Sequence, residues 1–228
     1  LVQGTEYTGY FKSAPMNNPE NIFAIHHTKV QDRGTASIGS MYFSGDASGN
    51  PLAQGVSGWA EIYASVKYKN FIDQNPEDLR RNFITPYILN GVQQVSTRLN
   101  PETPMYYINK YTLQEGVINL SSPVYLRLAE MYLIRAEANA KLGNTQLALD
   151  DVNIIRQRAG LTGDKLYALG NLGTKTAFDV VMEERWLELA FEGHRAYDLF
   201  RNNLPMERHY PGPHSLNNTP TTEPDQKV

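Results

Sequence analysis

The sequence predicts a mainly α fold, in which a helical hairpin serves as a scaffold and long irregular loops lie beside it. Residues 121–202 carry apolar side chains at spacings of three and four, which is the pattern of amphipathic helices. Residues 1–120 lack this pattern and include a stretch rich in Gly, Ser and Ala with aromatic residues set into it. The 228 residues suit one large domain, and we expect residues 1–228 to form part or all of one.

Composition excludes several classes of function. The formal net charge is −3 and no lysine-rich run occurs, so we expect no nucleic-acid partner. The absence of cysteine excludes disulfides, thiolate zinc sites and cysteine nucleophiles. No apolar run approaches the roughly 20 residues that a membrane-spanning helix needs. Tyrosine is abundant, at 14 residues, and suits both wet binding surfaces and the edges of a core.

The first 120 residues predict a loop-rich region with short elements. Glu20–His27 and Met105–Leu113 have the composition of strands, and part of Gly58–Asp73 is expected to be helical. Asn75–Ile84 begins like a capped helix, with Asn75 as the N-cap and Pro76 in the first helical position. Gly34–Trp59 predicts a long functional loop, because a linker rarely carries so many aromatic residues.

Three helices are expected from residue 122 onward. The first begins at Ser122 and ends at Gly143, and the second runs from Thr145 to Arg158. The third covers Thr176–Asn202, and Gly193 within it predicts either a bend or a change of helix. The predicted buried faces of the first two are Leu128, Ala129, Tyr132, Ala136 and Ala140, and Leu147, Ala148, Val152 and Ile155. Residues 203–228 predict a surface loop, since they are rich in Pro, Asn and Thr.

The first two helices are similar to one tetratricopeptide unit, with small residues on the first helix, a Gly-Asn turn and an alanine-bearing second helix. Only one such unit is present. A single unit cannot bury its own apolar face, so partner helices must come from the third helix or from further chain.

Charged residues are dense on these helices and could be catalytic or structural. Arginine forks that hold carboxylates favour a structural role for Arg127, Glu130, Arg135, Glu137, Arg156 and Arg158. Paired carboxylates among Glu183, Glu184, Glu188 and Glu192 could do the acid/base work of a glycoside hydrolase. Neighbouring arginines, however, would keep these carboxylates ionised, which is wrong for a general acid. We therefore expect no catalytic residue.

No cofactor or metal site is expected. His26 and His27 are adjacent and would point to opposite sides of a strand, and the other histidines lack zinc-protease spacing. Asp46, Ser48 and Asn50 resemble the start of a calcium loop, but Pro51 occupies the position that requires glycine. Nucleophile-elbow, Walker and dinucleotide-binding motifs do not occur.

Aromatic residues near the Gly-rich loop are the candidate binding residues. Sugar rings present a C–H face on which aromatic side chains stack, and Trp59, Tyr42, Phe43 and Tyr63 could form such a surface. The alternative is that Trp59 anchors the loop to the core, and the sequence leaves both possibilities open.

Two segments carry a specific family resemblance. The stretches VYLRLAEMYLIRAEANAKLGNTQLALDDVNIIRQRAGL (124–161) and VMEERWLELAFEGHRAYDLFR (181–201) closely resemble the SusD/RagB family. The residues that fill the family pattern are Arg127, Glu130, Arg135, Glu137, Asn153, Arg156, Arg158, Gly160, Glu184, Arg185, Glu188, Glu192, Gly193, Arg195, Asp198 and Arg201. The resemblance covers about residues 120–202 and implies a SusD-like fold, in which tetratricopeptide-like helices are the scaffold and residues 1–120 form loops that face the ligand.

The resemblance also implies a function. Members of this family are outer-membrane lipoproteins of Bacteroidetes that capture nutrients at the cell surface for a SusC-like TonB-dependent transporter. It implies oligosaccharide binding without catalysis and a lipid anchor outside this chain. A RagB-like peptide binder is the first alternative, a glycoside hydrolase is less favoured, and a helical-repeat scaffold would need further repeats. Since the anchoring cysteine and the family's early helices do not precede Leu1, and its usual closing segment does not follow Val228, we expect an internal or late piece of a longer protein.

Overall fold

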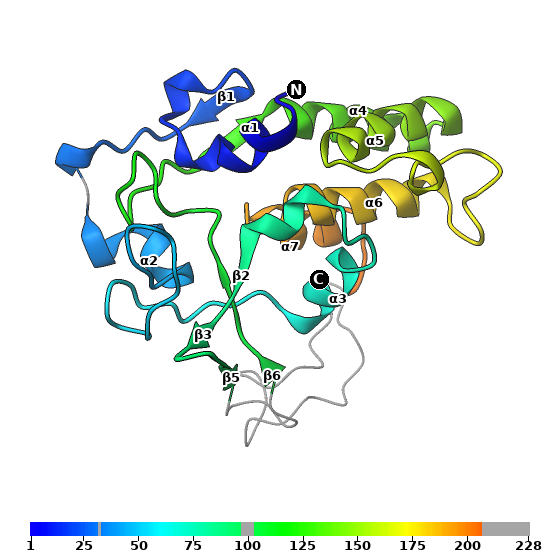
Figure 1. Cartoon of the computed structure of the whole chain (residues 1–228). Coiled ribbons are helices and arrows are strands. Elements are labelled where there is room, and N and C mark those ends of the chain that lie inside the picture. The colour runs from blue at the N-terminus through cyan, green and yellow to red at the C-terminus, as the bar shows by residue number, and fades with distance from the viewer. Residues whose placement is uncertain (32, 97–102, 207–228) are drawn as a thin grey trace.

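The computed structural model describes residues 1–31, 33–96 and 103–206 (Figure 1). Helices dominate it, as the sequence predicts. The α-helices of the described residues are α1 (Gly4–Gly9), α2 (Ile38–Tyr42), α3 (Val66–Ile72), α4 (Leu128–Lys141), α5 (Thr145–Arg158), α6 (Ala177–Glu188) and α7 (His194–Arg201). Shorter 3₁₀ turns are η1 (Tyr10–Lys12), η2 (Pro15–Asn17), η3 (Lys29–Gln31), η4 (Gly34–Ala36), η5 (Leu79–Phe83) and η6 (Gly163–Lys165).

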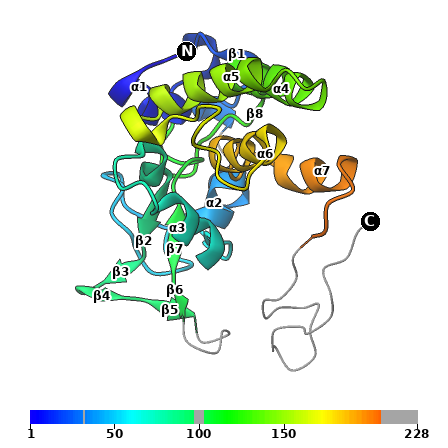
Figure 2. The ribbon, with the colours of Figure 1, turned by 90° about the vertical axis from the view of Figure 1, so that its right-hand side faces the viewer.

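The strands are short and form two-stranded antiparallel pairs. They are β1 (Asn21–Ala24), β2 (Ile84–Pro86), β3 (Ile88–Leu89), β4 (Val92–Gln93), β5 (Val95–Ser96), β6 (Thr103–Pro104), β7 (Tyr106–Ile108) and β8 (Val124–Arg127). Within the described ranges, β1 pairs with β8, β2 with β7, β3 with β4 and β5 with β6. The small pairs β3–β4 and β5–β6 extend away from the helices, at the bottom of Figure 2.

The scaffold is the α4–α5 hairpin with α6 packed against it (Figure 1). Small and branched side chains from all three helices fill the space between them, and the cluster consists of Ala136, Ala148, Leu149, Val152, Ala177, Val180 and Val181. Helix α5 has the predicted boundaries. Leu149 rather than Leu147 belongs to its buried face, because Leu147 is exposed and Leu149 is fully buried.

The predicted third helix is interrupted, as its glycine indicates. Helix α6 begins at a capping box in which Thr176 and Asp179 exchange hydrogen bonds. It ends at Glu188, and α7 begins after Gly193, which has a φ of 85°. Only glycine adopts this left-handed conformation easily, so the break permits the chain to redirect Asp198 and Arg201.

Two predicted helix starts are wrong. Residues 124–127 form strand β8, paired with β1, and α4 begins at Leu128 instead of Ser122. Asn75 does not cap an α-helix: the chain turns there, and Asp78 caps the 3₁₀ helix η5 by accepting from the Arg80 amide. In both places a partner distant in sequence, β1 or the buried charges around Arg80, decides the local structure.

The strand predicted at Met105–Leu113 is confirmed only as β7, and the chain after it follows an irregular path. The strand in Glu20–His27 and the helix in Gly58–Asp73 are confirmed as β1 and α3. The loop Gly34–Trp59 is irregular apart from η4 and α2. From residue 207 on, the predicted surface loop lies outside the described residues.

Candidate functional site

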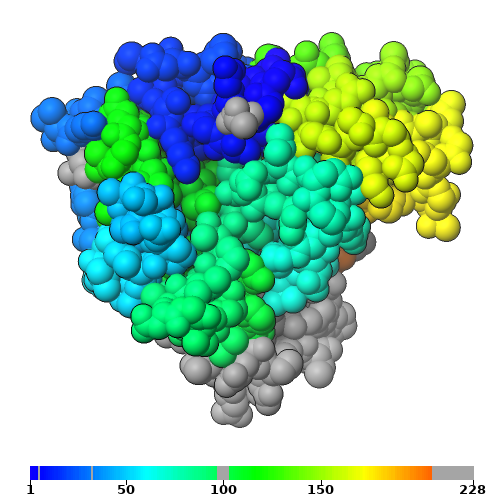
Figure 3. All heavy atoms as spheres, viewed as in Figure 1, coloured from blue at the N-terminus to red at the C-terminus, as the bar shows by residue number. Residues whose placement is uncertain are grey.

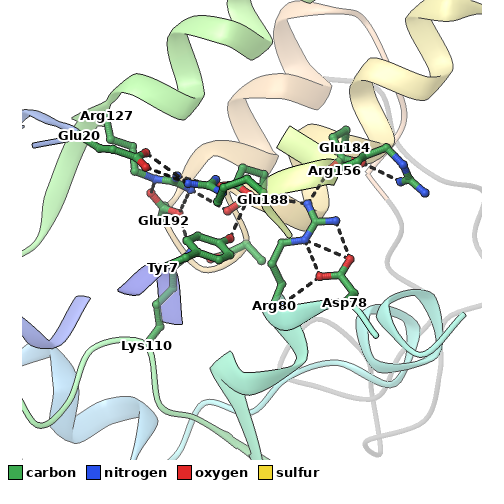
Figure 4. Close-up of polar contacts among 12 residues, drawn as sticks. Tyr7, Glu20, Asp78, Arg80, Lys110, Arg127, Arg156, Glu184, Glu188 and Glu192 are labelled. Carbon is green, nitrogen blue, oxygen red and sulfur yellow. Dashed lines mark hydrogen bonds and ion pairs between the residues drawn. The ribbon is translucent and has the colours of Figure 1, made fainter. Parts of the chain in front are cut away.

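The charges on the scaffold helices form a buried charge network rather than an open site (Figure 4). The network has five cationic and five anionic side chains, so its formal charges balance. Each of these side chains is almost fully buried. The members are Arg80, Lys110, Arg127, Arg156 and Arg158, with Glu20, Asp78, Glu184, Glu188 and Glu192.

Glu188 lies at the centre of this network (Figure 4). Its carboxylate accepts hydrogen bonds from Arg127 at 2.5 Å, from Arg158, and from the Tyr7 hydroxyl at 3.0 Å. Burial alone would raise the pKa of this carboxyl, but the surrounding guanidinium groups outweigh burial and hold the pKa far below its ordinary value. Glu188 therefore stays ionised.

Glu184 is also bound by two arginines. It accepts from Arg80 at 2.5 Å and from Arg156 at 3.0 Å, and it is 1% exposed. A general acid must hold a proton near neutral pH and reach its substrate. Both carboxylates are buried away from any substrate and Glu188 is also held ionised, so these positions do not suit the acid/base pair considered for a glycoside hydrolase.

A second group of ion pairs joins α4, α6 and α7. Glu137 accepts from Arg201 at 2.5 Å and from Lys141 at 2.8 Å. Arg185 donates to Asp198 at 2.9 Å. These contacts confirm that the signature charges lock helices together.

The partners of three signature residues were not evident from helical spacing. Arg127 binds Glu188 and Glu192 instead of Glu130. The Glu130 carboxylate lies 3.4 Å from His194 and 3.8 Å from Arg185. Arg135 is exposed and pairs with Asp151 on α5 at 2.6 Å. The architectural role stands, but the contacts of these three residues reach other elements of the fold, unlike the pair of Glu137 and Lys141 within α4.

The candidate binding site lies instead on the loop predicted from its aromatic residues. Helix α2 and residues 58–62 run side by side, since the Ala60 amide donates to Ser40 at 2.7 Å and the Ile62 amide to Met41 at 3.0 Å. A Cβ atom at Gly58 would overlap the carbonyl oxygen of Phe43. Glycine is therefore required for this close approach, which fixes the backbone just before Trp59.

Trp59 is an exposed aromatic side chain with a fixed orientation. Its exposed fraction is 52%, and its indole Nε1 donates a 3.0 Å hydrogen bond to the carbonyl of Thr35. This bond ties the ring to the neighbouring loop while much of the ring contacts solvent. Aliphatic side chains on α2 and within residues 56–62 are exposed as well, and we call the set the Trp59 platform: Trp59, Ile38, Val56 and Ile62.

The backbone next to the platform is strained. Ala60 has a φ of 48°, a left-handed conformation that is uncommon for residues other than glycine. Ala60 is fully buried and packs with Phe43, Tyr87 and Tyr107. Such strain persists only where the surroundings over-determine the conformation, and it is concentrated at ligand-binding positions.

Phe43 must be removed from the predicted ligand residues. It is 0% exposed and belongs to the core cluster with Ala60, Tyr87 and Tyr107. Its ring meets that of Tyr107 edge-on at 5.7 Å. From the sequence alone, an aromatic residue in a loop that faces solvent cannot be distinguished from one that packs into the core. Phe43 packs into the core and anchors the loop.

Tyr42 and Tyr63 are half-buried and lie beside different clusters. Tyr42 packs near Tyr111, with ring centroids 5.7 Å apart, and burial raises the pKa of its hydroxyl. Tyr63 stacks on Tyr107 at 5.9 Å, and Tyr107 stacks in turn on Tyr87 at 4.3 Å. Of the four predicted binding residues, Trp59 is therefore exposed, Tyr42 and Tyr63 are half-buried and Phe43 lies in the core.

The structure adds the aliphatic residues of the Trp59 platform to the candidate site, and no sequence signal had distinguished them.

Among the described residues, no group of three or more His, Asp or Glu side chains could hold a metal ion. The same part of the chain contains no helix whose length and apolar character would let it span a bilayer.

Comparison with known proteins gives consistent results. The model of the SusD family matches residues 63–227. The SusD-like protein P38 of Formosa agariphila is 35% identical over 88 residues, which cover 37% of this chain and 18% of that protein.

Solved structures agree at the level of the fold. A SusD superfamily protein from Bacteroides thetaiotaomicron has a TM-score of 0.71 at 22% identity, covering 96% of this chain and 44% of that one. A SusD-like carbohydrate binding protein from Bacteroides vulgatus has a TM-score of 0.64 at 22% identity, covering 92% and 40%. The chain therefore spans less than half the length of these relatives.

Proposed function

Because the chain belongs to the SusD family, we propose that it binds oligosaccharide at the cell surface without catalysis and delivers it to a SusC-like TonB-dependent transporter. The protein is then an outer-membrane lipoprotein, with its lipid anchor outside this chain. The Bacteroides origin of the similar structures supports a cell-surface location. The carbohydrate binding named for one of them supports this class of ligand.

The exposed, tethered indole of Trp59 is the observation that carries the proposal. A ring held by the Thr35 carbonyl loses little freedom when a sugar stacks on it, so more of the contact energy appears as affinity. Binding of this kind requires no shifted carboxylate, and Glu184 and Glu188, considered for hydrolysis, are buried in ion pairs of the core. Tyr42 and Tyr63 remain secondary candidates at the edge of the surface.

Glycan binding by a Trp59→Ala variant tests the proposal. A panel of oligosaccharides is screened by affinity electrophoresis, and hits are measured by isothermal titration calorimetry. We expect Trp59→Ala to weaken binding about thirtyfold, which corresponds to the loss of about 2 kcal/mol typical of an interface hot spot. Tyr197→Ala is the matched control, because Tyr197 is also an exposed aromatic residue but lies on α7. Equal affinity of wild type and Trp59→Ala for every bound glycan would exclude Trp59 as the site.

Peptide binding is the second candidate, and the aliphatic residues of the platform favour it. Ile38, Val56 and Ile62 are exposed and could accept apolar side chains of an extended peptide. A peptide pool is therefore titrated beside the glycan panel with the same two variants. Saturable binding of peptides alone, reduced by Ile62→Ser, would replace the carbohydrate proposal.

A further inference from the structure

A hollow separate from the Trp59 platform lies between the N-terminal segment and η5. Figure 3 shows it between the dark-blue first residues and the teal segment after α3, with green atoms of the chain after β7 recessed at its base. Its volume is about 200 Å³. This is smaller than the roughly 300 to 1,000 Å³ of sites for drug-sized ligands, so it suits one chemical group or one sugar unit.

The base of the hollow is aromatic and cationic. Phe11 and Phe83 line it and meet edge-to-face, with ring centroids 5.4 Å apart. The Lys110 ammonium lies 4.5 Å from the Phe11 centroid and 5.0 Å from that of Phe83. Lys110 is 1% exposed and donates to the carbonyl of Ala190 at 2.9 Å and to Glu192 at 2.5 Å.

The rim of the hollow is polar. Lys12 and Asn82 are exposed, and Asn109 is half-buried with its amide nitrogen donating to Thr85 at 2.6 Å. Within the described chain, the side chains of Lys12 and Asn82 have no hydrogen-bond or ion-pair partner. The rim thus offers an ammonium group and an amide that are free to contact a ligand.

The charge of the hollow has one sign. Two lysines line it, and none of the described residues that line it is acidic. Glu192 neutralises Lys110 from within the network, so Lys12 remains as an uncompensated cation at the rim. Lysine binds carboxylate and sulfate groups as a point charge, and an amide adds a directed hydrogen bond.

We propose that this hollow is a subsite for the anionic group, carboxylate or sulfate, of an acidic sugar unit in the bound oligosaccharide. The proposal rests on the proposed function and refines its ligand class. The loop that carries the Trp59 platform is visible on the same face, in light blue and cyan in Figure 3. In this proposal a chain-like ligand stacks on Trp59 and places its charge beside Lys12.

The test compares trigalacturonate with its fully methyl-esterified, uncharged form. Calorimetric titrations are made with wild type, Lys12→Ala and Lys29→Ala at low and high ionic strength. Wild type should bind the acid about tenfold more tightly than the ester, as one charge-assisted contact predicts. Lys12→Ala should abolish this preference and leave ester affinity unchanged, whereas Lys29→Ala, which removes an exposed lysine elsewhere, should keep it. Added salt should reduce the preference, because the contact at Lys12 is exposed.

A sulfated galactan trimer and its desulfated form distinguish sulfate from carboxylate in a parallel titration. A tenfold preference that depends on Lys12 for either charged ligand supports the subsite and identifies its anion. Absence of any preference, or its survival in Lys12→Ala, overturns the subsite.

Trp59→Ala separates this failure from failure of the proposed function. If Trp59→Ala weakens binding of both the charged and the uncharged ligand, and no preference for the charged one depends on Lys12, the proposed sugar binding is supported and the anionic subsite is excluded. If wild type binds no saccharide of the panel, both proposals fall.

Discussion

The hydroxyl of Tyr7 donates a 3.0 Å hydrogen bond to the carboxylate of Glu188, although 181 positions separate the two residues. The ring of Tyr7 also lies under the guanidinium of Arg158, 3.8 Å from its centroid to the guanidinium carbon. Helix α1 is thereby fastened to α5 and α6 through buried polar contacts. The Glu188 carboxylate, which resembles a catalytic group in the sequence, therefore has a structural role: it joins α1 to the scaffold helices.

Removing the Tyr7 hydroxyl should destabilise the protein. Tyr7→Phe keeps the ring beneath Arg158 but removes one hydrogen bond to a buried carboxylate, a contact that stabilises by about 1.5 to 3 kcal/mol. Urea unfolding should show a lower midpoint with an unchanged slope. Tyr197→Phe is the control, since Tyr197 is 74% exposed, and it should leave the midpoint in place. A midpoint for Tyr7→Phe equal to that of wild type would contradict the role of this bond.

Neutralising Glu188 should be more severe. Glu188→Gln leaves Arg127 and Arg158 without their shared negative partner in the core, and breaking a buried ion pair in this way costs about 3 to 5 kcal/mol. The same substitution at Glu183, whose pair with Lys175 is partly exposed, should cost less than about 1 kcal/mol. Equilibrium unfolding of both variants at neutral pH measures the difference. Similar losses of unfolding free energy in the two variants would show that a buried ion pair of the network stabilises the fold no more than an exposed one.

Acid should weaken the contact between α4 and α7. Burial opposes ionisation of Glu137, but hydrogen bonds from Arg201 and Lys141 outweigh it and lower the pKa to about 2 from 4.5. In the unfolded chain this carboxyl is protonated first as the pH falls, so its stabilising contribution is present above about pH 5 and lost toward about pH 2.

The Glu137→Gln variant isolates this contribution. The free energy of unfolding of wild type relative to Glu137→Gln should shrink by at most about 2 kcal/mol between about pH 6 and pH 3, since solvent screens both exposed partners. A difference that does not change over this range would exclude the proposed linkage.

Gly58→Ala should displace the backbone that carries the Trp59 platform. The new methyl group would overlap the Phe43 carbonyl and force residues 58–62 away from α2, at a cost of about 1 to 3 kcal/mol. Glycan affinity should fall although no ligand-contacting side chain has changed. Gly170→Ala, at a glycine with open space and no left-handed φ, should preserve both affinity and stability. Unchanged binding by Gly58→Ala would mean that the platform does not depend on this close approach.

The scaffold was predictable because its signals are local. Helix α5 begins and ends as expected, since its turn glycines and apolar spacing lie within the segment itself. The start of α4 could not be predicted in this way, because β8 forms only through pairing with β1, which lies about a hundred residues earlier. Arg127 is the last residue of β8, and the fold places Glu188 and Glu192 of a distant segment against it, which spacing along the chain could not reveal.

The candidate site was predictable only in outline. Aromatic density marked the loop, and Trp59 is exposed there. Burial of Phe43 depends on Tyr87 and Tyr107, which come from the strand region, so its neighbours in sequence could not reveal it. The hollow beside Lys12 likewise joins three segments whose proximity exists only in the folded chain.

The long span of the ionic contacts has a consequence for biosynthesis. Glu20 pairs with Arg158, which is 138 residues further along the chain. At about 5 to 20 residues per second, a ribosome needs on the order of ten seconds to supply that arginine after Glu20 has emerged. During this interval the early carboxylate stays hydrated, and α1 cannot take its final place. Helices α5 and α6, which supply Arg158 and Glu188, must therefore be made before α1 can form its contacts through Tyr7.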